Sequence, residues 1–103
     1  MLKTLVEERT GERSGTPTEL KQRVADEFAQ VQTLPSEDDV WRIAIPFGRT
    51  GLQQIVVDLR LTPIAGADPP LTRIGLLAFG KEGLLSRKPT AKTADRVLAA
   101  LAT

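Results

Sequence analysis

The segment Gln53–Leu61 alternates apolar and polar side chains, and this alternation constrains the fold more than any other feature of the chain. Its odd-numbered positions from 55 to 61 hold only isoleucine, valine or leucine, whereas Gln54, Asp58 and Arg60 hold even-numbered positions. Because a β-strand points successive side chains to opposite faces, the pattern predicts a strand in a sheet with one dry face and one wetter face. It indicates an architecture and carries little information about chemistry.

Two neighbouring segments predict two further strands. Residues 40–47 place four apolar side chains on one face. Residues 71–79 are apolar on both faces, which favours a central strand or one that lies under a second layer. The glycines of the Gly48–Gly51 loop permit a reversal of the chain, so the three strands predict an antiparallel meander.

The clearest helix signal follows the polar N-terminal segment. Thr16 can cap a helix, Pro17 suits its first position, and Glu19 completes a capping box. Apolar residues then recur at helical spacing as far as Val31. The pattern predicts a helix over 17–32.

A second helix is predicted near the C-terminus. Ala94, Val97 and Leu101 recur at helical spacing and form an apolar stripe. Thr90 or Thr93 can serve as its N-cap.

The predicted fold class is α+β. A three-stranded antiparallel meander is flanked by an N-terminal and a C-terminal helix, in the order α-β-β-β-α, with the helices packed on one sheet face. Residues 17–103 are expected to form this single domain. In residues 1–16, Leu5 and Val6 suit one helical turn, but so short a helix is marginal alone. We therefore expect residues 1–16 to be flexible or docked on a partner or on the body of the domain.

The apolar pattern also predicts the register of the first two strands. Pairing residues 45 with 55, 43 with 57 and 41 with 59 keeps their apolar side chains on one face. The same register places Arg42 directly opposite Asp58 on the other face.

Composition limits the chemistry that the protein can perform. The chain has no histidine, no cysteine and no tyrosine, which removes imidazole and thiolate groups and the commonest general base near neutral pH. We therefore expect no enzyme activity, no metal, no cofactor and no small-molecule substrate. No run approaches the roughly 18 apolar residues of a membrane span, and no secretory signal is recognised, so we expect no membrane partner and a cytoplasmic location.

The outer side of the predicted sheet carries the best candidate site. Two helices of moderate length can cover one face of a sheet but not both, and an uncovered apolar patch rimmed by charge is typical of a protein interface. We predict binding to another protein, or to a second copy as a homodimer, in the role of an adaptor or assembly chaperone. The alternative is that the N-terminal segment or the proline-rich loop covers this face. The predicted interface residues are Arg42, Ala44, Val56, Asp58, Arg60 and Leu77.

The uneven charge of the chain supports nucleic-acid binding as a second hypothesis. Residues 1–39 hold five basic and nine acidic residues, a net of −4, whereas residues 40–103 hold nine and four, a net of +5. A helix N-terminus near the basic residues favours phosphate, but the chain has only four aromatic residues, most of them assigned to the core, which leaves few for base stacking. The basic residues are Lys81, Arg87, Lys88, Lys92 and Arg96.

The predicted order of elements across residues 17–102 resembles that of small secretion-chaperone-like α+β domains. The resemblance lies in the order helix, three strands, helix, and no sequence motif accompanies it. It implies a domain that binds extended protein segments and forms dimers.

Overall fold

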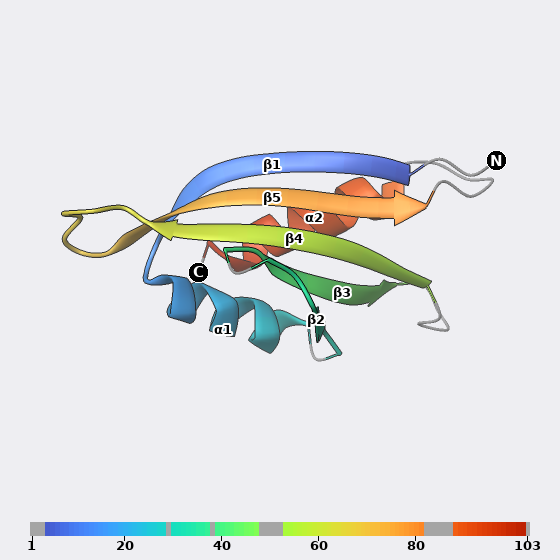
Figure 1. Cartoon of the computed structure of the whole chain (residues 1–103), viewed down its shortest axis with the longest axis horizontal. Coiled ribbons are helices and arrows are strands. Elements are labelled where there is room, and N and C mark those ends of the chain that lie inside the picture. The colour runs from blue at the N-terminus through green and yellow to red at the C-terminus, as the bar shows by residue number, and fades with distance from the viewer. Residues whose placement is uncertain (1–3, 29, 38, 48–52, 82–87, 103) are drawn as a thin grey trace.

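The computed structural model describes residues 4–28, 30–37, 39–47, 53–81 and 88–102. Five strands and two helices occupy these residues (Figure 1). The strands are β1 (Thr4–Ser14), β2 (Gln32–Leu34), β3 (Trp41–Phe47), β4 (Gln53–Pro63) and β5 (Leu71–Lys81), and the helices are α1 (Pro17–Glu27) and α2 (Lys88–Ala100).

The five strands form one sheet in the order β1-β5-β4-β3-β2, and every neighbouring pair is antiparallel. The α+β class predicted from the sequence is correct, but the three-stranded meander in the order α-β-β-β-α is wrong. The meander of β3, β4 and β5 gains β1 at one edge and β2 at the other. The order of elements that resembled the secretion-chaperone-like domains is therefore not the order of the structure.

Strand β1 replaces the single helical turn expected in the N-terminal segment. It pairs along its whole length with β5, from Thr4 opposite Lys81 to Ser14 opposite Leu71. Strand β5, apolar on both faces, thus has a neighbour on each side. Residues 4–14 of the N-terminal segment are held on the body of the domain by this pairing.

Helix α1 begins as predicted but ends earlier. The Thr16 hydroxyl accepts a hydrogen bond from the backbone N–H of Glu19 at 3.2 Å, and the Glu19 carboxylate accepts one from the backbone N–H of Thr16 at 3.3 Å. These bonds complete a capping box. The helix stops at Glu27 instead of residue 32, because Phe28 leaves helical geometry and enters the core, where it is 6% exposed.

Helix α2 begins before the predicted caps. Its first residue is Lys88, so Thr90 and Thr93 lie inside the helix, and both are buried. Thr90 lies so close to Gly80 of β5 that a Cβ added at Gly80 would overlap the Thr90 hydroxyl oxygen. Gly80 therefore allows the start of α2 to approach the sheet closely.

The predicted register of β3 and β4 is confirmed. Ile43 pairs with Val57, and Arg42 pairs with Asp58. The apolar side chains of this register enter the core, and the charged pair lies on the opposite face.

The core lies between the two helices and one face of the sheet, which we call the inner face. In Figure 1, α2 runs behind β5 and β4. The buried cluster takes side chains from α1, α2, β3, β4 and β5. Its members are Leu20, Val24, Phe28, Ile43, Ile45, Ile55, Val57, Leu59, Ile74, Leu76, Ala78, Ala94, Val97 and Leu101.

Candidate functional site: the outer face of the sheet

The candidate site is the face of the sheet opposite the core, which we call the outer face. All six residues predicted as an interface lie on it, because each alternates with an inner-face neighbour or stands directly across from another outer-face residue. Ala44 stands opposite Val56, Asp58 opposite Leu77, and Arg60 opposite Gly75. The six residues therefore share one surface across β3, β4 and β5.

One line of directly opposed residues crosses the outer face and is almost entirely apolar. It runs from Val6 of β1 through Phe79, Val56 and Ala44, and we call these four residues the apolar row. Val6 is 52% exposed, whereas Ala44 is 1% exposed although it does not belong to the core cluster. The row thus offers a protruding side chain at one end and a small, recessed one at the other.

An ion pair crosses the outer face beside the apolar row. Arg42 donates from Nε to Oδ1 of Asp58 at 2.7 Å and from Nη2 to Oδ2 at 2.9 Å. The hydrogen bonds to Asp58, and then its negative charge, raise the pKa of Arg42 above its ordinary value. Because the bonds are bidentate, they fix the orientation of the guanidinium.

The ion pair belongs to a second line of directly opposed residues. From Asp58, this line continues to Leu77 of β5 and then to Glu8 of β1. Leu77 is partly exposed, and Glu8 is exposed. An apolar side chain therefore lies between the ion pair and a carboxylate at the edge of the sheet.

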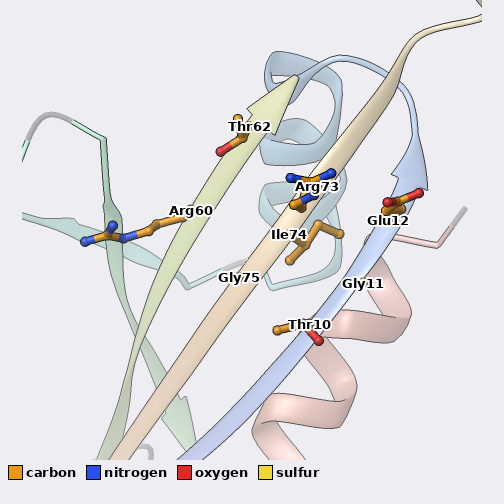
Figure 2. A pocket seen from close by; sticks show the side chains of 8 residues that line it. All are labelled: Thr10, Gly11, Glu12, Arg60, Thr62, Arg73, Ile74 and Gly75. Carbon is orange, nitrogen blue, oxygen red and sulfur yellow. The ribbon is translucent and has the colours of Figure 1, made fainter. Parts of the chain in front are cut away.

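The outer face is hollowed over Gly75 of β5, where the strand has no side chain. Two adjoining hollows of about 480 and 260 Å³ share Gly75, Thr10 and Arg60. In Figure 2, Gly75 lies between Thr10 of β1 and Arg60 of β4, and the Arg60 side chain extends away from β5. A Cβ added at Gly75 would only make an ordinary contact of 3.9 Å with Cβ of Arg60. The hollow is therefore open space that a side chain of another molecule could fill.

Charge is divided unevenly across the outer face. At the β1 margin, Glu8 and Glu12 are both exposed. Toward β3 and β4 lie Arg42 and Arg60, and Arg60 makes an exposed ion pair of 3.4 Å with Asp39. One margin is therefore acidic, and the other presents guanidinium groups.

The residues of the nucleic-acid hypothesis lie elsewhere in the fold. Lys81 ends β5 and Lys88 begins α2, while Arg87 lies outside the described residues. Lys92 and Arg96 are exposed on α2, and the guanidinium carbon of Arg96 stands 4.8 Å from the centre of the Phe28 ring. That contact directs Arg96 toward the protein itself and does not favour phosphate binding. The Gly48–Gly51 loop also lies outside the described residues.

The sequence interpretation missed the β1 share of the outer face. The β1 residues on this face include Val6, Glu8 and Thr10. The sequence of β1 does not alternate between apolar and polar residues, so it gave no strand signal. The available signal was indirect: a strand that is apolar on both faces, such as residues 71–79, needs a neighbour on each side. That requirement pointed to a missing strand without identifying which residues form it.

The part of the chain that the structure describes shows neither a metal site nor a membrane-spanning helix. Among those residues, no group of three or more histidine, cysteine, aspartate or glutamate side chains is placed to hold a metal ion. No helix among them has the length and apolar character needed to cross a bilayer. The cytoplasmic location expected from the sequence stays a prediction.

Comparison with known proteins adds no family. No protein-family model matches the chain, and no curated protein matches it significantly.

Proposed function

We propose that the protein is a non-enzymatic protein-binding domain that acts as an adaptor or assembly chaperone through its outer face. The observation that carries this proposal is the apolar row, which crosses a sheet face that lies away from both helices. Both helices contribute to the core cluster on the inner face. An apolar patch with a charged rim, on a face that the helices do not cover, is the usual anatomy of a protein interface.

The nucleic-acid alternative gains no comparable support. Of its five residues, only Lys92 and Arg96 have described side chains, and Arg96 lies over Phe28. Lys88, Lys92 and Arg96 belong to α2, which packs against the inner face, and Lys81 ends β5. A nucleic-acid surface there would leave the apolar row of the outer face unexplained.

The proposal is tested by placing charges on the outer face. Val56→Glu combined with Leu77→Glu should leave the chain folded and abolish its association with protein, because two carboxylates would have to be desolvated within an apolar contact. Association is measured as molecular mass by light scattering and as affinity capture from cells that express the protein.

The matched control carries two glutamates on the helices. Ala25→Glu and Ala99→Glu replace exposed helical alanines, so the control has the same net charge and should keep full association. Circular dichroism and urea unfolding show whether each variant is folded. Equal association of the native chain and the Val56/Leu77 variant would refute the proposal.

A further inference from the structure

We propose that the partner of the outer face is a second copy of this chain, packed sheet to sheet about a two-fold axis that runs along the strands between β4 and β5. This inference rests on the proposed function and names its partner. A rotation about that axis lays β5 over β4 of the second copy and β1 over β3 of the second copy. Residues that are directly opposed across the strands of one copy, and so lie at the same height along the strand axis, then face each other between the copies.

The apolar row matches itself under this rotation. Phe79 faces Val56 of the second copy, because the two residues are directly opposed across β4 and β5. Val6 faces Ala44 of the second copy, so the side chain that is 52% exposed meets the one that is 1% exposed. Because Ala44 is almost fully covered by its own chain, the protruding valine packs on the side chains around Ala44, twice in the dimer.

The charges on the two margins also become complementary. Glu8 and Arg42 lie at the same height, on the line through Asp58 and Leu77. The rotation carries Glu8 of each copy over Arg42 of the other. A guanidinium has five N–H donors and Asp58 takes two of them, so Arg42 can serve both carboxylates.

The hollow over Gly75 receives a side chain in the same arrangement. Arg60 stands directly opposite Gly75 within one copy, so it lies above Gly75 of the other copy after the rotation. Glu12 lines this hollow together with Thr10. An arginine that enters it therefore finds a carboxylate and a hydroxyl as partners, next to the Arg73 side chain that also lines the hollow.

The other face-to-face two-fold arrangement does not match. An axis that runs across the strands through the middle of the face reverses positions along them, so the apolar row would lie over the line that contains Thr62, Arg73 and Glu12. That arrangement sets the charges of Arg73 and Glu12 against the apolar row. The axis along the strands sets one charged side chain, Asp58, over Leu77, and Arg42 already pairs with that carboxylate. The charge pattern and the apolar pattern thus favour the same axis.

The face is large enough for a stable dimer. Strands β1, β4 and β5 each have 11 residues and β3 has seven. With about 3.3 Å per residue and about 4.8 Å between strands, these four strands span roughly 600 Å² per copy as a flat surface. Projecting side chains add to this area. A standard protein interface buries about 800 Å² per partner, so the whole outer face would be used.

Spin labels at two positions on β4 test the axis. The chain has no native cysteine, so Gln54→Cys and Thr62→Cys, prepared separately, each carry a single label. Both residues are exposed outer-face positions, and their separation of eight residues is roughly 26 Å along the strand. Both labels should give interprotomer distances below about 25 Å by pulsed electron resonance, because packed sheets lie about 10 Å apart.

An axis across the strands cannot bring both label pairs close. At least one pair would then be separated by more than about 26 Å within the plane of the sheet. One long distance, or no dipolar coupling at all, overturns the proposed dimer.

Charge reversal tests the contact between the copies. Glu8→Arg places a cation over Arg42 of the second copy and should raise the dimer dissociation constant about tenfold or more at low salt. The control Glu27→Arg makes the same charge change at an exposed position of α1 and should leave the constant within about twofold. Equal constants for the two variants overturn the inference.

The same measurements separate failure of the inference from failure of the proposed function. A monomeric native chain that captures a different protein, with capture lost in the Val56/Leu77 variant, refutes the second copy and keeps the binding function. Association that is insensitive to that variant refutes both.

Discussion

The inner and outer faces of the sheet are built by the same strands, yet their side chains follow different rules. On β5, Leu76 and Leu77 are consecutive, but Leu76 is 1% exposed within the core and Leu77 stays partly exposed on the outer face. The buried inner-face positions of β3, β4 and β5 are apolar except for Thr72. The outer face alternates apolar, charged and empty positions. The comparison indicates that the need to form a core explains the residues of the inner face. It does not explain the residues of the outer face, which we attribute to protein binding.

The largest expected difference between the faces comes from truncating these two leucines. Leu76→Ala should lower the free energy of unfolding by about 2–5 kcal/mol, because it opens a cavity in a closely packed core. Leu77→Ala should lower it by about 1 kcal/mol or less, since the side chain is already in contact with water. Urea unfolding at concentrations at which the chain is monomeric measures both values. Similar losses for the two variants would break the distinction between the faces.

The stability losses of the two leucine variants should also respond differently to protein concentration. If a second copy binds the outer face, Leu77→Ala should acquire a larger effect at concentrations at which the native chain is dimeric, because association adds to apparent stability by mass action. Leu76→Ala should lose about the same free energy at every concentration.

Two glycines of β5 give the next largest contrast. Gly80→Ala should destabilise the fold by about 1–3 kcal/mol, because the new Cβ overlaps the Thr90 hydroxyl oxygen and crowds Ile55. Gly75→Ala on the outer face should be neutral or stabilising by up to about 1 kcal/mol, since its Cβ meets only Arg60 at an ordinary distance. Thermal or urea unfolding measures both.

A double variant identifies the cause of the Gly80 effect. Thr90→Ala removes the overlapping hydroxyl and should recover part of the stability lost in Gly80→Ala. An additive loss would show that the hydroxyl is not responsible.

The smallest expected difference concerns the two ion pairs. On the inner side, Arg9 donates to Asp95 of α2 at 2.9 Å, and on the outer side Arg42 pairs with Asp58. Asp95→Ala and Asp58→Ala should each change stability less than the leucine truncations, because such pairs are screened by solvent and salt. Only Asp58→Ala should weaken self-association, measured by sedimentation at low and high salt. A weaker dimer for Asp95→Ala would contradict the assignment of the interface to the outer face.

The contributions of Arg9 and Arg42 to stability should not depend on pH near neutrality. Hydrogen bonds to Asp95 and then to Glu7 raise the pKa of Arg9, as those to Asp58 raise the pKa of Arg42. A cation whose folded pKa is raised contributes fully below its unfolded pKa and loses that contribution only as pH rises through the folded value. For arginine this window lies at strongly alkaline pH.

The parts of the fold that could be predicted are those in which apolar residues repeat with a clear period. Alternation gave the register of β3 and β4, and with it the place of Arg42 opposite Asp58. The capping box gave the start of α1 at Pro17. Each of these signals is local, so neighbouring residues in the sequence are sufficient to read it.

The parts that could not be predicted depend on contacts between distant residues. Strand β1 is an edge strand and is mostly polar, and on its inner side Arg9 bonds to Asp95 instead of entering an apolar core. Strand β2 has only three residues, too few to show alternation. The outer face was recognised in part, but Val6 and Glu8 were missed together with the strand that carries them.

The pairing of β1 with β5 also has a consequence for how the chain acquires its structure. Opposed residues in this pair are separated by 57 residues at Ser14 and Leu71 and by 77 at Thr4 and Lys81. During synthesis, β1 leaves the ribosome long before β5, the strand with which it pairs, exists. Such long sequence separations raise the contact order and slow folding. The native sheet is therefore expected to close late, after residue 81 has emerged, with the N-terminal strand as the last to gain its hydrogen bonds.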